Sequence, residues 1–207
     1  MQIYSFSPFG YEGSLVNVEV DLRRGIPAVD VVGLADGAVK ESRERMRSAI
    51  RNSGYEFPPE RVLISLSPAD VRKEGAGFDL AIALAVLAER KKIKSREESW
   101  SDGKTAEFLA EQAAETEDDS WQPDDDCEKE PGIIEKDAVL VMGELELNGN
   151  VRPVRGIEAA VSTAVEAGIS MCIVPSANTE EARGVKGMKV FGAENLTEAF
   201  EALYSQN

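Results

Sequence analysis

Four short runs near the start of the chain have the alternation or the β-branched content of strands: residues 2–7, 15–21, 28–32 and 61–66. In the second run Val16, Val18 and Val20 alternate with polar residues, which is the pattern of a strand with one buried face. The pattern therefore predicts that this region contributes several strands to a sheet.

Two helices are predicted among these strands. Asp36 can cap a helix that runs to about Asn52, because its carboxylate can accept hydrogen bonds from the unpaired backbone N–H groups of the first turn. A second helix, over residues 78 to about 89, is rich in alanine and leucine and is expected to be buried. In the first helix, four apolar residues fall near one face: Val39, Met46, Ala49 and Ile50.

The apolar pattern resumes at Ala138 with a hairpin. Strands are predicted over residues 139–147 and 151–154. Asn148 and Gly149, which join them, are typical of a type I′ turn, because both residues tolerate a positive φ.

Helices and strands then alternate to the end of the chain. A helix over residues 155–166 ends before Gly168, which suits a left-handed C-cap. Strands are predicted at residues 171–174 and 189–191. Two further helices are predicted to start at capping boxes, formed by Asn178 with Glu181 and by Asn195 with Glu198.

A segment of different composition separates the two patterned regions. Residues 91–136 are rich in Ser, Asp, Glu, Gln and Pro, and are predicted to be a disordered insertion. Residues 97–136 hold 15 of the 38 acidic residues and three of the 23 basic ones, so most of the net charge of −15 belongs to this segment. We predict a single α/β domain, built from residues 1–90 and 137–207 and split by the acidic insertion at 91–136.

The composition excludes several kinds of chemistry. The chain has no histidine, which excludes Ser-His-Asp and Cys-His arrangements and histidine-ligated zinc. Its two cysteines, Cys127 and Cys172, cannot form a disulfide framework, and a reducing compartment is expected. No metal or cofactor site is expected in the chain. We also expect a cytoplasmic location without membrane contact, because no long apolar run and no secretory signal is recognised.

Two short motifs resemble ligand sites but lack essential parts. Residues 101–105 end in Gly-Lys-Thr as a phosphate-binding P-loop does, but Glu98 stands where the first glycine of that motif is required. Residues 124–126 are three adjacent aspartates, whereas calcium loops place their oxygen ligands at alternate positions around a glycine. Neither motif is therefore expected to bind its ligand.

Basic residues gather on one face of the first predicted helix, at steps of three, four and four residues. Such a stripe can contact a phosphate backbone. It can equally be a solvated helix face on which glutamates pair with the arginines. With basic residues near two turns added, the candidate DNA-binding set is Lys40, Arg43, Arg47, Arg51, Arg72, Lys73, Arg152 and Arg155.

The most specific signal is a set of ordered stretches at residues 25–28, 31–36, 39–45, 52–59, 67–75 and 143–175. Together they resemble the N-terminal domain of the Mg-chelatase-like YifB/ComM family of bacterial proteins, which is associated with AAA+ ATPases. The resemblance covers nearly the whole chain except residues 91–136. This family domain is similar to the Lon protease domain and to the C-terminal domain of the recombination factor RadA. The resemblance therefore implies an α/β (α+β) fold of the Lon protease-domain type, with a mixed sheet packed by helices.

Lon cleaves peptides with a serine and a lysine, whose amine takes the proton of the serine hydroxyl. Matching the turn at residues 73–79 to Lon places Gly77 at the serine position, and matching residues 143–154 places Ala160 at the lysine position. The resemblance therefore implies a degenerate protease site and a chain that is not an enzyme.

Family members continue into an AAA+ ATPase domain with a P-loop, which this chain is expected to lack. ATP and Mg²⁺ are therefore expected only in such a domain. The resemblance implies a non-catalytic N-terminal domain of a ComM/YifB-like protein that processes DNA in natural transformation. It would engage DNA and help to assemble a homo-oligomeric ring, a hexamer through the ATPase domain. The alternatives are a Lon-type Ser-Lys protease, disfavoured by Gly77 and Ala160, and an oligomerisation scaffold without DNA contact.

Overall fold

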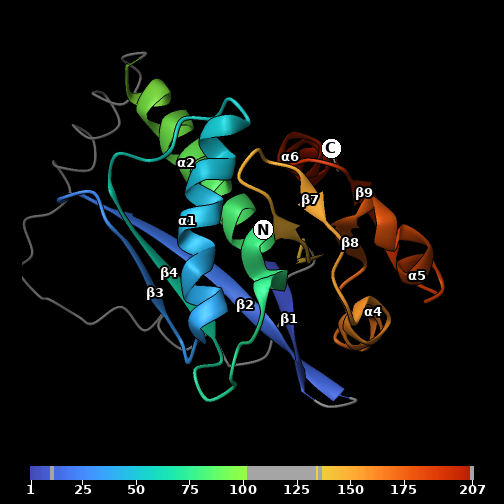
Figure 1. Cartoon of the computed structure of the whole chain (residues 1–207). Helices are drawn as coiled ribbons and strands as arrows, with labels where there is room; N and C mark the ends of the chain where they lie inside the picture. The colour runs from blue at the N-terminus through green and yellow to red at the C-terminus, as the bar shows by residue number, and fades with distance from the viewer. Residues whose placement is uncertain (10–11, 102–133, 135–136, 206–207) are drawn as a thin grey trace, which may run out of the picture. The chain divides into compact units, whose positions relative to one another are not determined.

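The computed structural model describes residues 1–9, 12–101, 134 and 137–205. The chain divides into two compact units, one made of Met1–Glu89 with Ile134–Asn207 and the other of Arg90–Ile133. The first unit contains the sheet drawn in Figure 1. Of the second unit, only residues 90–101 are described.

Seven strands of the first unit form one mixed sheet in the order β3-β4-β2-β1-β5-β8-β9. β1 pairs antiparallel with β2 and parallel with β5, so strands from both ends of the chain share the sheet. The expected mixed sheet is confirmed, and strands from the end of the chain complete a sheet that the first strands begin. The strands are β1 Ile3–Phe9, β2 Glu12–Arg23, β3 Val29–Val32, β4 Arg61–Ser67, β5 Val139–Val141, β8 Met171–Pro175 and β9 Lys189–Ala193.

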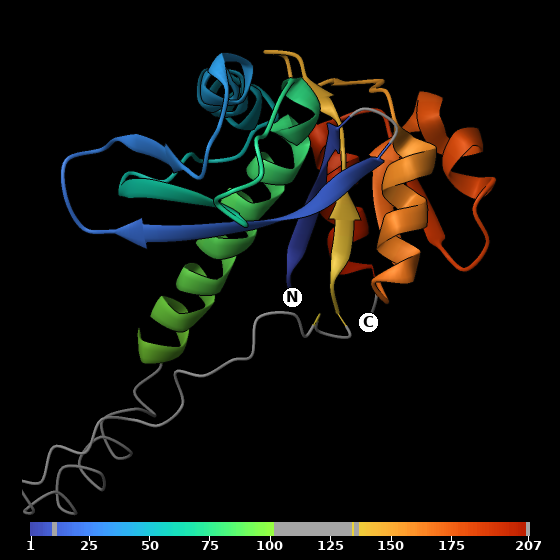
Figure 2. The ribbon, with the colours of Figure 1, turned by 90° about the horizontal axis from the view of Figure 1, so that it is seen from below.

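Helices cover both faces of this sheet, as the two views in Figures 1 and 2 show. α1 (Gly37–Asn52), the first part of α2 (Asp79–Ser101) and α6 (Leu196–Tyr204) pack on one face. α4 (Ile157–Glu166) and α5 (Thr179–Arg183) pack on the other. The architecture is therefore a mixed α/β fold with the sheet as its middle layer.

Successive residues of the central strands enter different cores, because strand side chains point alternately to opposite faces of a sheet. Met171 and Ile173 of β8 belong to the core beneath α1 and α2, whereas Cys172 and Val174 belong to the core beneath α4. Burial raises the pKa of the Cys172 thiol to about 12, so this thiol stays protonated and unreactive near neutral pH.

The hairpin after β5 is formed, but its turn is not the predicted type I′. Only Gly149 has a positive φ, of +92°, whereas Asn148 does not. The Gly149 N–H donates to the Glu146 carbonyl at 3.0 Å, and the Glu146 N–H donates to the Asn150 carbonyl at 2.9 Å. This is the pattern of a three-residue loop that ends in a left-handed glycine. The strands of the hairpin are β6 Glu144–Leu145 and β7 Val151–Arg152.

This hairpin loop packs against the end of α1. A Cβ atom at Gly149 would lie 2.2 Å from the Ser53 hydroxyl oxygen, so the close approach requires glycine as much as the turn does. The Asn52 side-chain amide donates to the Leu147 carbonyl at 2.6 Å. The tertiary contact with α1 therefore helps to select the observed turn.

The predicted helix caps have different outcomes. The side chains of Asp36 and Asn195 accept N–H bonds at the starts of α1 and α6, as predicted. Asn178 does not cap α5. Its side chain instead accepts from the Val154 N–H and donates to the Val154 carbonyl, both at 3.0 Å. β7 ends at Arg152, so Val154 lies beyond the strand pairing and its backbone groups bind this amide.

α2 is longer than predicted, since it ends at Ser101 rather than near residue 89. It therefore enters the segment predicted to be disordered. Residues 79–101 contain no glycine or proline, and the Lys, Arg and Glu residues after the apolar part have good helix propensity. Of the rest of the predicted insertion, residues 102–133 and 135–136 lie outside the described residues. No helix in the described part of the chain is both long and apolar enough to cross a bilayer.

Candidate functional site

The predicted basic stripe lies on the solvent-facing side of α1. The apolar side of this helix is buried in the core, as its periodicity predicted. The basic side is more open: Lys40, Arg43 and Arg51 are exposed, and Arg47 is partly buried.

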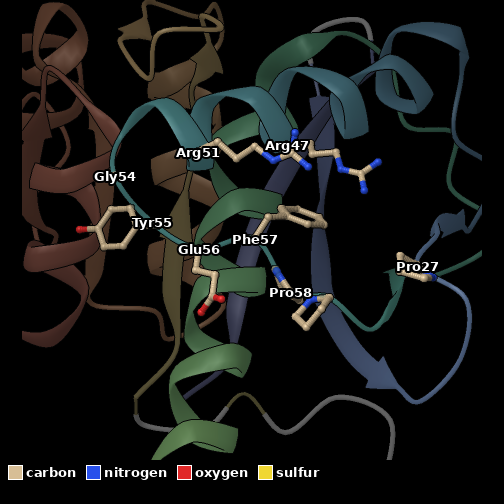
Figure 3. A pocket seen from close by; sticks show the side chains of 9 residues that line it. Pro27, Arg47, Arg51, Gly54, Tyr55, Glu56, Phe57 and Pro58 are labelled. Carbon is tan, nitrogen blue, oxygen red and sulfur yellow. The ribbon is translucent and has the colours of Figure 1, made fainter.

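The second half of α1 forms one wall of an open groove with a volume of about 610 Å³ (Figure 3). Arg47 and Arg51 extend from α1, and Phe57 comes from the segment that follows the helix (Figure 3). The Arg47 guanidinium carbon lies 5.1 Å from the centre of the Phe57 ring, which is the geometry of a cation–π contact. The groove is further lined by Pro27, Gly54, Tyr55, Glu56, Pro58 and Pro59.

The two arginines of this groove form no ion pair among the described residues, although Glu56 also lines the groove. Arg43, by contrast, lies 3.6 Å from Glu44 on the same helix. The Arg47 Nε atom is buried and has no hydrogen-bond partner in the described part of the chain. The groove therefore places unpaired cations beside an aromatic ring.

The other predicted basic residues are not collected in this groove. Arg72 pairs with Glu74 at 2.8 Å. Arg152 pairs with Glu146 at 2.6 Å, and this bond lowers the pKa of the Glu146 carboxyl. Those two residues line a different groove, of about 520 Å³. Arg155 is exposed. The eight predicted residues therefore do not form one continuous site.

Lys73 does not lie on a basic surface, which corrects the prediction. Its side chain is fully buried, and its amine donates to the Pro68 carbonyl. The backbone of Lys73 is held by hydrogen bonds to Leu34 and Asp36, at the start of α1, and its side chain is enclosed there. Burial lowers the pKa of the amine, and the nearby Asp70 carboxylate partly opposes this shift.

The buried amine leads to a pH prediction. We expect the free energy of unfolding of the wild type, relative to that of Lys73→Met, to rise with pH between the lowered pKa of folded Lys73 and the ordinary value of 10.5. In that window the unfolded chain binds more protons than the folded one, so raising the pH favours folding. Urea titrations of both proteins at several alkaline pH values measure the difference. A difference that does not change with pH would contradict this assignment.

Gly77 and Ala160 carry no hydroxyl or amine. Gly77 lies in a one-turn helix at Ala76–Phe78, and its carbonyl accepts the Gly143 N–H at 3.0 Å. Ala160 is buried in α4. Neither position can therefore supply a nucleophile or a base. Among the described residues, no three Cys, Asp or Glu side chains are grouped so that they could hold a metal ion.

A buried ionic cluster near Gly77 was not predicted. Asp79, at the start of α2, is fully buried and accepts hydrogen bonds from Ser42 and from Arg45, whose Nε lies at 2.7 Å. The Leu145 N–H of the hairpin also donates to Asp79, at 3.2 Å. The hydrogen bond to Asp79 raises the pKa of Arg45 above its already high ordinary value, so the guanidinium stays charged. The sequence signal that could have revealed this cluster is an aspartate, Asp79, directly before a long apolar run.

Several known proteins are similar to this chain. Residues 18–107 and 128–178 match the family described as subunit ChlI of Mg-chelatase. An uncharacterised protein of Mycobacterium tuberculosis is 34% identical over 93% of this chain and 31% of its own length. YifB of Escherichia coli is 31% identical over 94% of this chain and 31% of its own length. Competence protein ComM of Haemophilus influenzae is 29% identical over 99% of this chain and 32% of its own length. The chain thus spans about a third of the length of these relatives.

Proposed function

The chain belongs to the Mg-chelatase-like family that includes YifB and ComM, and from this premise we propose that it is a non-catalytic domain of a larger DNA-processing ATPase. In that assembly it engages DNA and contributes to ring formation in the cytoplasm. ATP and Mg²⁺ would act in another domain.

The observation that carries this proposal is the basic side of α1. Arg47 and Arg51 line an open groove without ion-pair partners in the described part of the chain, and Lys40 and Arg43 extend the same face. Exposed cations in a row attract a phosphate backbone and displace its counterions, which is the main source of sequence-independent DNA affinity. The net charge of −15 does not oppose this, because most of it belongs to residues 97–136.

Ring formation is supported by apolar side chains at one edge of the sheet. Ile26, Leu34 and Val32 are 87%, 58% and 46% exposed, and they lie in or beside the edge strand β3. Edge strands with exposed apolar residues are suited to contact another chain. A contact between neighbouring copies would cover them.

The two alternatives have less support. A Lon-type protease needs reactive groups that Gly77 and Ala160 do not have. The carboxylate of the nearby Asp79 already accepts hydrogen bonds from Arg45 and Ser42. A scaffold without DNA contact leaves the unpaired cations of the α1 groove without a role.

We expect the double substitution Arg47→Glu with Arg51→Glu to weaken DNA binding at least tenfold at low salt. The slope of log affinity against log salt should fall by about 1 for each phosphate that the protein no longer neutralises. Fluorescence anisotropy with labelled DNA over a salt series measures both quantities. The matched control is Arg183→Glu with Lys186→Glu, which makes the same charge change at exposed positions in and beside α5.

If the two double variants lose DNA affinity equally, the loss is explained by the change in net charge alone, and this result would contradict a DNA-binding site on α1. Unchanged binding in both, or no DNA binding by the wild type, would favour the scaffold. Covalent labelling of the chain by a serine-directed peptidase probe would instead support the alternative of a Lon-type protease.

A further inference from the structure

The groove of about 520 Å³ lies where two neighbouring strands of the sheet end. β8 and β9 pair in parallel, so their carboxyl ends lie at the same edge of the sheet. Beyond β8 the chain leads to α5, which packs on one face of the sheet, and beyond β9 it leads to α6, which packs on the other. Adjacent parallel strands whose connections diverge in this way leave a crevice, and open α/β sheets bind ligands in such crevices. Ser176, after β8, and Glu194, after β9, line the groove at this point.

The β6–β7 hairpin forms the remaining wall of this groove, which we call the hairpin groove. The Val151 N–H donates to the Glu194 carbonyl at 2.9 Å, so the hairpin is fixed to the end of β9. The Glu194 N–H donates to the Glu198 carboxylate at 2.8 Å. The backbone of Glu194 is therefore held on both sides. The volume of the groove is within the range of sites that hold a small molecule.

The hairpin wall carries a positioned guanidinium. The Arg152 Nε donates to Glu146 at 2.6 Å, and Glu146 also accepts from the side-chain amide of Asn150 at 3.3 Å. The bond to Arg152 lowers the pKa of the Glu146 carboxyl, so this partner stays ionised near neutral pH. Because the Nε is engaged, the terminal amino groups of Arg152 are left as donors. Such a pair of donors matches the two oxygens of a carboxylate.

The wall formed by the strand ends carries the complementary group. Glu194 is exposed, and its carboxylate has no ion-pair or hydrogen-bond partner among the residues that the structure describes. We propose that the hairpin groove binds a zwitterionic α-amino acid, with its carboxylate on Arg152 and its ammonium on Glu194. This inference is independent of the proposed DNA contact, because the hairpin groove and the α1 groove share no lining residue.

Ligands of a single charge fit the hairpin groove less well. A phosphate or a nucleotide would meet the carboxylates of Glu146 and Glu194 as well as the Arg152 guanidinium. A metal ion would meet that guanidinium, and no three Cys, Asp or Glu side chains of the described residues are grouped to hold one. A neutral sugar would gain only hydrogen bonds in which its own groups carry no charge, and these are weaker. Since two carboxylates and one guanidinium line the groove, an acidic side chain on the amino acid is also disfavoured.

The test titrates the 207-residue chain with L-leucine, with L-leucinamide, which lacks the carboxylate, and with N-acetyl-L-leucine, which lacks the ammonium. We expect L-leucine to bind about tenfold more tightly than either analogue, because each analogue loses one charge-assisted contact. L-lysine should bind more tightly than L-glutamate. Isothermal titration calorimetry measures the affinities. Amide NMR shifts locate the site, and they should centre on residues 150–152, 176–177 and 193–194.

Two variants separate the two contacts. Glu194→Gln should weaken L-leucine binding about tenfold and leave N-acetyl-L-leucine unchanged, because that analogue already lacks the ammonium. Arg152→Gln should weaken L-leucine binding and leave L-leucinamide unchanged, because that analogue already lacks the carboxylate. Losses that do not add in this way indicate direct contact. The matched controls are Glu166→Gln and Arg155→Gln, which make the same changes at exposed positions that do not line the groove.

Four outcomes would overturn the inference. They are L-leucine binding no more tightly than its two analogues, D-ribose binding as tightly as L-leucine, equal losses in the controls, or amide shifts centred elsewhere on the chain. The substituted side chains are exposed, so thermal unfolding of the variants should change little, and this measurement separates lost folding from lost binding. If DNA binding is present while L-leucine does not bind, only this inference fails. If L-leucine binds while DNA does not, only the proposed function fails.

Discussion

Replacing Asp79 with alanine is expected to lower the free energy of unfolding by about 3–5 kcal/mol. The carboxylate is fully buried, and it accepts hydrogen bonds from Ser42, from the Arg45 guanidinium and from the Leu145 backbone. Its removal leaves a largely enclosed guanidinium and a buried N–H without an acceptor. Because these partners lie on α1 and on the hairpin, Asp79 connects three segments that are far apart in the sequence.

The matched control is Glu74→Ala, which removes an exposed partner of Arg72 at 2.8 Å. We expect this change to cost at most about 1 kcal/mol, because solvent screens exposed ion pairs. Urea denaturation of both variants gives the comparison. The double variant Arg45→Met with Asp79→Leu should recover much of the loss, since it removes both charges. Similar small losses at Asp79 and Glu74 would show that the buried cluster does not stabilise the fold.

Asn178→Ala is expected to lower the free energy of unfolding by about 2–4 kcal/mol. The side-chain amide satisfies both the N–H and the carbonyl of Val154, at 3.0 Å each, and also donates to Glu181 at 3.1 Å. Asn178 is 7% exposed, so water cannot easily replace these bonds. The amide thereby holds the segment after β7 against the junction of β8 and α5.

Two further variants define this effect in the same urea assay. Asn52→Ala removes an exposed asparagine with a single bond, to the Leu147 carbonyl, and should cost about 1 kcal/mol or less. Asn178→Asp keeps an acceptor for the Val154 N–H but loses the donor to its carbonyl, so an intermediate loss is expected. A loss at Asn178 no larger than that at Asn52 would contradict the role of the amide.

Local pattern was sufficient for most of the regular elements. The periodicity of α1 and its Asp36 cap are properties of adjacent residues, and the structure confirms both. The predictions failed where a distant segment competes for the same groups. Asn178 has the spacing of a capping box, but its side chain binds the backbone N–H and carbonyl of Val154 and accepts no N–H bond at the start of α5. Asn148 and Gly149 suit a type I′ turn, but the loop that packs against Ser53 has a different turn, in which only Gly149 has a positive φ.

The candidate site was predictable to a similar extent. Helical spacing alone is enough to place Arg47 and Arg51 on one face of α1. It could not show that Phe57 lies beside them, because the turn after α1 decides where that ring points. Nor could it show that Lys73 is enclosed while Arg72, its neighbour, is exposed. Charge alone does not distinguish these two positions.

Residue identity and spacing along the chain were enough to define the family, the alternation of strands and helices, and the lack of reactive groups at positions 77 and 160. They were not enough to tell which cations are paired, buried or open. Ion pairing, burial and groove shape depend on contacts between segments such as α1, the Phe57 segment and the β6–β7 hairpin. Folding sets these contacts through distances in space, and such distances do not follow from separation along the chain.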